Sequence, residues 1–257
     1  MSLKELVQRP AIRRAFRQLA GPQRSPLVLQ RANLLIESRA GNETIVGHAF
    51  DYMARAKVVR ELRELDVKIF VHDWVAESAK ESLRRLCKTR AHQKRWQDFF
   101  LMARACFADY ELGKADALAL ASCAQYLAHA EVACRVHERY FDPDFRPEPE
   151  TTEELTRMIE LFDPAWRFAP RAICLLNPSF VGSESIGGAD ADLLTDNLLT
   201  DFKATKRKRI DGLLQLVGYA ALARDGGFVC GGQIHSIQIE EVAIYFARFG
   251  VCDKSTA

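Results

Sequence analysis

The sequence predicts a mixed α/β (α+β) protein, in which a small mixed β-sheet flanked by helices carries a large helical N-terminal elaboration. Two changes of pattern lead to this class. Up to residue 142, apolar residues recur at three- and four-residue spacing among Arg, Lys and Glu, as in amphipathic helices. After Pro170, short apolar runs bounded by Gly, Pro, Asn and Asp replace that pattern, as in β-strands. Long helical runs beside a few strands indicate such a fold.

The composition limits the class of protein further. The chain has 257 residues, of which 48% are hydrophobic and 27% charged, and this excludes intrinsic disorder. No apolar stretch approaches the roughly 20 residues of a membrane span, so we expect no membrane partner. The charged N-terminus lacks the apolar core of a secretion signal. Seven cysteines without a Cys-x-x-Cys pair predict reduced thiols and a cytoplasmic location.

The helices are expected first along the chain. Periodic apolar residues predict helices over residues 10–20, 27–38 and 44–64. Residues 73–142 continue the pattern and contain no proline. Residues 115–136 are rich in Ala and Leu, both strong helix formers.

A break in the helical pattern suggests where the chain divides. Residues 141–150 hold three prolines and four acids, which predicts a loop or linker. Thr151 and Glu154 then fit a capping box that starts a further helix, ending near Phe162–Pro164. We therefore expect a mainly helical region over 1–150, with 73–142 as a helical insertion. We expect an α/β core over 151–257, completed by helices from residues 1–64.

The strands are expected in the second part of the chain. Short apolar runs predict strands over residues 172–180, 189–195, 198–205, 228–232, 234–241 and 242–250, with a helix over 207–223. Asp196 and Asn197 separate two of these runs and suit a two-residue hairpin turn.

This hairpin brings charged residues together. With Asp196–Asn197 as the turn, Asp192 faces Asp201 and Asp190 faces Lys203, so all four side chains share one face of the sheet. Burying unpaired charges among leucines costs stability, so the cluster indicates chemistry. Closely spaced carboxylates select Mg²⁺ or Mn²⁺, and a neighbouring Lys can orient a water molecule or stabilise charge on a phosphate. The pattern favours phosphodiester hydrolysis.

A family resemblance rests on the same residues. The run from Asp192 to Asp201-Phe-Lys203 resembles the motif of the PD-(D/E)xK nuclease superfamily, and Gln215 with Tyr219 is similar to the Gln-xxx-Tyr pair of its RecB-like branch. The resemblance covers roughly residues 170–250. It implies a restriction-endonuclease-like core and Mg²⁺- or Mn²⁺-dependent cleavage of DNA. It also implies catalytic roles for Asp192, Asp201 and Lys203, braced by Gln215 and Tyr219.

Several assignments stay open within this resemblance. We favour Asp192 as the first metal ligand, with Asp190 as a close second. Glu184 is the nearest candidate for the upstream Glu that the family often adds, or is an exposed loop residue. Asp66 and Lys68 form a second acid-x-Lys pattern, which we interpret as a surface pair.

A basic run close to the hairpin is the candidate nucleic-acid contact. With a net charge of only +2, no overall field indicates nucleic acid. The run is either a solvated face or a contact to phosphates. It consists of Lys206, Arg207, Lys208 and Arg209.

The sequence also departs from the RecB-like pattern. Where the branch often has Gly-xxx-His on an early helix, this chain has Gly47 and Asp51, with His48 directly after the Gly. A position on the helix surface is the simpler interpretation of both residues. The spacing from Cys230 to Cys252 does not match a four-cysteine cluster, so we expect no iron–sulfur cluster.

Two other classes of function remain open. A catalytically degenerate nuclease fold would bind nucleic acid or a partner protein without cutting, and a helical interaction module would depend on a partner protein alone. The sequence specifies neither a partner protein nor an oligomeric state.

Overall fold

The computed structural model describes residues 8–14, 32–38, 41–135, 137–186, 188–206 and 211–256, and within them the mixed α/β class is confirmed. The chain forms two compact units. The sheet unit contains Met1–Leu35, Glu64–His72 and Ala165–Ala257, and the helical unit contains Ile36–Arg63 and Asp73–Pro164. The division thus falls after residue 164 rather than at the predicted residue 150. The helix over 44–64 and the capping-box helix belong to the helical unit and not to the core of the sheet unit.

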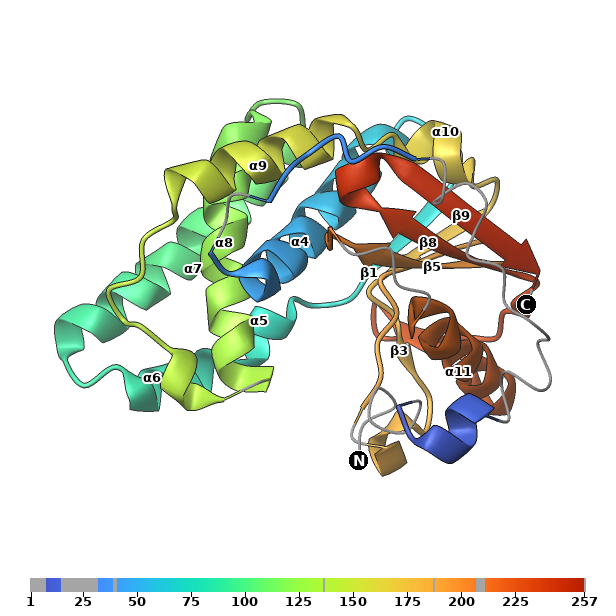
Figure 1. The fold of residues 1–257 in the computed structure, drawn as a ribbon. Coiled ribbons are helices and arrows are strands. Elements are labelled where there is room, and N and C mark those ends of the chain that lie inside the picture. The colour runs from blue at the N-terminus through green and yellow to red at the C-terminus, as the bar shows by residue number, and fades with distance from the viewer. Residues whose placement is uncertain are drawn as a thin grey trace. The chain divides into compact units, whose positions relative to one another are not determined.

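The helical unit is built around one central helix. α8 packs against α4, α7 and α9 (Figure 1). Most of the side chains of α8 are buried. A helix that is apolar on every side is typically an internal one, which explains the Ala- and Leu-rich sequence. The helices are α4 (Glu43–Leu62), α5 (Val75–Ser78), α6 (Lys80–Leu86), α7 (Arg90–Glu111), α8 (Ala117–Arg135), η1 (Glu138–Tyr140) and α9 (Pro149–Glu160).

Polar side chains fix where these helices begin. Asn42 accepts hydrogen bonds from the N–H groups of Thr44 and Ile45 at the start of α4, and Thr89 accepts one from His92 at the start of α7. α9 begins at Pro149, two residues before the predicted start. There the Thr151 hydroxyl donates to Glu148. Proline suits a first helical turn because its missing N–H would have no partner there.

The sheet unit holds a mixed sheet of six described strands in the order β1-β2-β4-β5-β8-β9. The pairs β1–β2 and β5–β8 are parallel, and the other three pairs are antiparallel. The strands are β1 (Lys68–Val71), β2 (Ile173–Leu176), β4 (Leu193–Thr195), β5 (Leu198–Lys203), β8 (Glu241–Phe246) and β9 (Val251–Thr256). β5 is therefore internal, with β4 on one side and β8 on the other.

One helix covers a face of this sheet, and the apolar residues between the helix and the sheet form the core of the sheet unit. α11 (Asp211–Gly226) packs against β5 and β8 (Figure 1). Leu216 of α11 is completely buried in one apolar cluster with Leu199 and Ile244. A second sheet of three short strands adjoins α11 through β3. It consists of β3 (Ser179–Phe180), β6 (Phe228–Cys230) and β7 (Gln233–His235). The remaining described elements of this part are α10 (Pro164–Phe168), η2 (Ser183–Ile186) and η3 (Ala247–Phe249).

Some of the local predictions differ from the structure. The helix expected over 27–38 is wrong for residues 32–38, which are not helical, because the Leu35 N–H donates instead to the Arg248 carbonyl at 3.0 Å. Asp66 and Lys68 are both exposed shortly after α4, as expected of surface residues, and Lys68 begins β1 at the edge of the sheet. The strand expected over 234–241 is confined to Gln233–His235 and the first residue of β8.

None of the helices in the described ranges has the length and apolar content that crossing a bilayer requires.

Candidate active site

The β4–β5 hairpin has the predicted register. Leu193 pairs with Thr200 and Thr195 with Leu198, so Asp196 and Asn197 form the turn. Asp196 has a φ of 51°, a left-handed conformation that Asp tolerates better than most residues.

The Asp196 side chain also anchors the neighbouring strand. Its carboxylate accepts hydrogen bonds from the backbone N–H groups of Arg171, Ala172 and Ile173 at 2.8–3.0 Å. Burial alone would raise the pKa of Asp196, but these hydrogen bonds hold it below its usual value. Asp196 therefore joins the hairpin turn to the start of β2.

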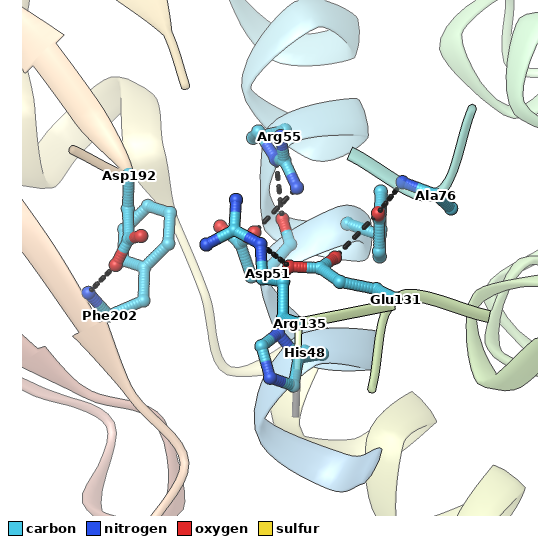
Figure 2. A network of polar contacts seen from close by, with 9 residues as sticks. His48, Asp51, Arg55, Ala76, Glu131, Arg135, Asp192 and Phe202 are labelled. Carbon is cyan, nitrogen blue, oxygen red and sulfur yellow. Dashed lines mark hydrogen bonds and ion pairs between the residues drawn. The ribbon is translucent and has the colours of Figure 1, made fainter. Parts of the chain in front are cut away.

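Asp192 and Asp201 lie next to each other at the open end of the hairpin. The main-chain pairing ends at Leu193–Thr200, and the next step of the same register places Asp192 opposite Asp201. Here the Phe202 N–H donates to Asp192 Oδ2 at 2.5 Å (Figure 2). The Asp192 carboxylate thus takes the place of a backbone carbonyl as the acceptor of this N–H. The hydrogen bond holds Asp192 next to Phe202, which directly follows Asp201.

Lys203 is paired with Asp201 on the same strand. Its Nζ lies 2.6 Å from Asp201 Oδ2 and 2.9 Å from Oδ1. Residues two apart on a strand share a face, which explains the contact. Asp201 is only 4% exposed, whereas the Lys203 side chain is 31% exposed, so the pair joins a buried carboxylate to an amine that reaches solvent.

α11 places Gln215 and Tyr219 beside these residues. Gln215 Nε2 donates to the Tyr219 hydroxyl at 2.6 Å, and the buried Tyr219 ring stacks on Phe180. Burial raises the pKa of Tyr219 and the Gln215 hydrogen bond lowers it, while the charges of the aspartates of the hairpin raise it further. The hydroxyl therefore stays protonated and can donate a hydrogen bond.

A glycine allows α11 to approach the strand closely. A Cβ atom on Gly212 would lie 2.8 Å from Ile244 Cδ1, 3.5 Å from Lys203 Cε and 3.7 Å from Asp201 Oδ2. Any larger residue would push the first turn of α11 away from the sheet or displace Ile244.

Asp190 and Glu184 are placed differently from Asp192. Asp190 is half-buried and its backbone forms an isolated bridge with Ser179, and Glu184 is exposed in η2. In the described part of the chain, no three His, Cys, Asp or Glu side chains are grouped so that they could hold a metal ion. The donors that the hairpin brings together are thus two aspartates. Two carboxylates fit Mg²⁺, which usually takes one or two from the protein and completes its shell with water and phosphate oxygens.

The predicted basic contact is described only at its first residue. Lys206 is exposed three residues after Lys203, whereas Arg207, Lys208 and Arg209 lie outside the described residues.

A second polar cluster, inside the helical unit, was not predicted as a group. The buried Glu131 carboxylate accepts a hydrogen bond from the Tyr52 hydroxyl at 2.6 Å and lies 3.0 Å from Arg135 Nε and 3.2 Å from His48 Nδ1 (Figure 2). Burial alone would raise the pKa of Glu131, but His48, Arg135 and the Tyr52 hydroxyl lower it to about 2. The signals in the sequence are an acid within the Ala- and Leu-rich run and an arginine four residues after it.

His48 and Asp51 belong to this cluster and not to a bare helix surface. Asp51 forms an ion pair with Arg55 one turn further along α4. Burial and the charge of Glu131 raise the pKa of Asp51, although the positive charges of Arg55 and Arg135 lower it. The Tyr52 hydroxyl also accepts the N–H of Ala76, which ties α5 to α4. Within the helical unit, the cluster joins α4, α5 and α8.

Comparison with protein-family models, curated proteins and solved structures finds no match to this chain.

Proposed function

We propose that this protein is a metal-dependent nuclease that hydrolyses phosphodiester bonds of DNA, of the PD-(D/E)xK type and closest to its RecB-like branch. The proposal rests mainly on one observation. The β4–β5 hairpin holds Asp192 against the backbone next to Asp201, and the Lys203 amine contacts Asp201.

Each residue of the hairpin has a role in this proposal. Asp192 and Asp201 hold Mg²⁺ or Mn²⁺, which when bound polarises a phosphodiester and lowers the pKa of a coordinated water. Lys203 orients the attacking water and offsets the negative charge that develops on the phosphate. Asp190 is the alternative to Asp192 as the first metal ligand, and Glu184 is the candidate for the upstream acid of the site.

The neighbouring residues support this site. The hydrogen bond between Gln215 and Tyr219 braces the face of α11 beside the aspartates. The basic run from Lys206 to Arg209 follows shortly after β5. In the proposal it contacts phosphates of the DNA strand that is cut.

A cytoplasmic location is part of the proposal. All seven cysteines carry free thiols, and four of them are buried. Free thiols are typical of a reducing compartment.

A cleavage assay tests the proposal. Linear, circular and single-stranded DNA are incubated with Mg²⁺, Mn²⁺ or EDTA, and both binding and cutting are scored. We expect cutting with either metal and none with EDTA. Lys203→Ala should abolish cutting and leave the circular dichroism spectrum unchanged. Lys68→Ala removes the exposed lysine of the second acid-x-Lys pattern and is the matched control, so it should cut like the wild type. Unchanged cutting by Lys203→Ala would falsify the mechanism.

A catalytically degenerate nuclease fold is the second candidate. The ion pair between Asp201 and Lys203 favours it, because both oxygens of this carboxylate already contact the Lys203 amine. This candidate binds DNA or a partner protein equally well with Mg²⁺ and with EDTA, and it cuts no substrate under any condition of the assay.

A further inference from the structure

An exposed basic segment lies in the helical unit, away from the hairpin in sequence. Residues 80–95 contain seven Lys and Arg but a single acid, Glu81. They span α6, the link that follows it and the first turns of α7, at the left of Figure 1. The seven cations are Lys80, Arg84, Arg85, Lys88, Arg90, Lys94 and Arg95.

Acidic neighbours neutralise only part of this charge. Lys80 lies 3.5 Å from Glu77, Lys94 lies 2.8 Å from Asp98 and Arg95 lies 3.1 Å from Asp144. The other four cations are exposed and form no ion pair with any residue in the described ranges. They are Arg84, Arg85, Lys88 and Arg90, and we call them the cation group.

The backbone that presents the cation group is well held. Gln93 Nε2 donates to the carbonyls of Arg84 and Cys87 at 3.2 and 3.1 Å, which fixes the end of α6 against the first turn of α7. Thr89 caps α7 in the middle of this segment. A polyanion that binds here therefore meets a preorganised set of charges and orders little backbone.

An apolar pocket opens beside the cation group. It has a volume of about 400 Å³, and the buried residues Leu83, Trp96 and Phe100 are part of its lining. Arg84, Arg104 and the acid Glu81 also line it, as does Leu101, which is 70% exposed. This size lies within the range of small-molecule sites and accommodates one unstacked base.

We propose that the cation group and this pocket form a binding site for single-stranded nucleic acid, in which the cations contact phosphates and the pocket takes a base. The combination of spaced cations with an apolar surface is the one that single-strand-binding proteins use. This inference deepens the proposed function, since it assigns a substrate-holding surface to the helical unit of a nuclease.

Binding measured without metal separates this inference from the nuclease proposal. The wild-type protein is titrated in EDTA against fluorescein-labelled oligo(dT), the matching duplex and a labelled polyglutamate peptide, by anisotropy at several salt concentrations. In the test variant, all four residues of the cation group are changed to Ser. The matched control changes four exposed cations elsewhere in the same unit to Ser, namely Lys114, Arg139, Arg146 and Arg157.

We expect the test variant to bind oligo(dT) about ten-fold more weakly or worse, and its salt slope to fall by about three, because each phosphate contact on a single strand contributes about 0.7. The control should change the affinity less than three-fold. Leu101→Ser should weaken binding about three- to ten-fold without changing the salt slope, since it removes only apolar contact with the base. Circular dichroism checks that all variants fold.

Three results would overturn the inference. The first is equal binding by the test and control variants, and the second is no oligo(dT) binding by the wild type. The third is a preference for polyglutamate that the test variant loses, which would make the surface a site for acidic peptides. In each case, Mg²⁺-dependent cutting in the separate cleavage assay decides whether the nuclease proposal stands.

Discussion

The backbone N–H of Phe202 donates to the Asp192 carboxylate across the β4–β5 hairpin, at the step where the main-chain ladder has ended. One oxygen of Asp192 is thus used to hold the strand end, while the charge of the same carboxylate is placed beside Asp201. The fold and the candidate site share this residue, and the two roles can be separated by substitution.

Asp192→Asn and Asp192→Ala should differ in stability but not in activity. Asn keeps an oxygen that can accept the Phe202 N–H, so we expect a loss below about 1 kcal/mol, whereas Ala leaves that group unpaired and costs about 1–3 kcal/mol. Both variants lose the charge and should lose Mg²⁺-dependent cutting. Urea unfolding and the cleavage assay measure the two effects. Full cutting by Asp192→Asn would contradict the role of Asp192 and mean that Asp190 is the first metal ligand.

Gly212→Ala should loosen the contact between α11 and the sheet. Its Cβ would clash with Ile244 Cδ1, so we expect a destabilisation of about 1–3 kcal/mol and slower cutting. Adding Ile244→Val removes the clashing methyl group and should restore much of the stability and the rate. Thermal unfolding and initial cleavage rates check this, and a double variant no better than the single one contradicts the close approach.

Gly47→Ala is the matched control for a glycine in a helix. A Cβ there would meet nothing within 4 Å, and Gly47 lies inside α4. We expect it to stabilise the protein by about 0.5–1 kcal/mol, because Ala loses less backbone entropy than Gly on folding.

Glu131→Gln should destabilise the protein in a pH-dependent way. The folded-state pKa of Glu131, about 2, lies below its ordinary value of 4.5. The ionised carboxylate therefore stabilises the fold fully above pH 4.5 and less as the pH falls towards 2. We expect the variant to be about 2–3 kcal/mol less stable at pH 7 and nearly equal to the wild type near pH 2–3.

Tryptophan fluorescence during urea unfolding measures this difference, since Trp74 and Trp96 both lie in the helical unit. Glu138→Gln, at an exposed position in η1, is the control and should show no such trend. A stability difference that stays constant from pH 7 to pH 3 would mean that the charge of Glu131 is not what the cluster stabilises.

Asp196→Ala should destabilise the sheet unit by about 2–4 kcal/mol, because three backbone N–H groups lose their acceptor and Ala is strained at a φ of 51°. Asp196→Gly relieves the backbone strain but does not restore the lost acceptor. Its stability should therefore lie between those of Asp196→Ala and the wild type. Guanidinium unfolding ranks the three proteins. Equal stability of Gly and Ala variants would show that backbone strain contributes little.

The parts of the fold that local patterns determine were predictable. The hairpin register follows from strand alternation and a two-residue turn, so the positions of Asp192, Asp201 and Lys203 could be derived in advance. The pair Gln215 and Tyr219 follows from helical spacing.

Features that depend on distant residues could not be derived. β1 has only four residues and its partner β2 lies far along the chain, so nothing local marks it as a strand. Residues 32–38 have a helical pattern, yet the Leu35 N–H is bound by Arg248. Two partners of Glu131, His48 and Tyr52, come from α4, and no spacing in the sequence connects them to α8.

The order of the segments along the chain has a consequence for synthesis. Since the polypeptide leaves the sheet unit after residue 72 and returns to it at residue 165, β1 emerges from the ribosome about a hundred residues before the strand that it pairs with. During that interval its N–H and C=O groups are available to other nascent chains, so chaperone binding during translation should be strongest while the helical unit is being made.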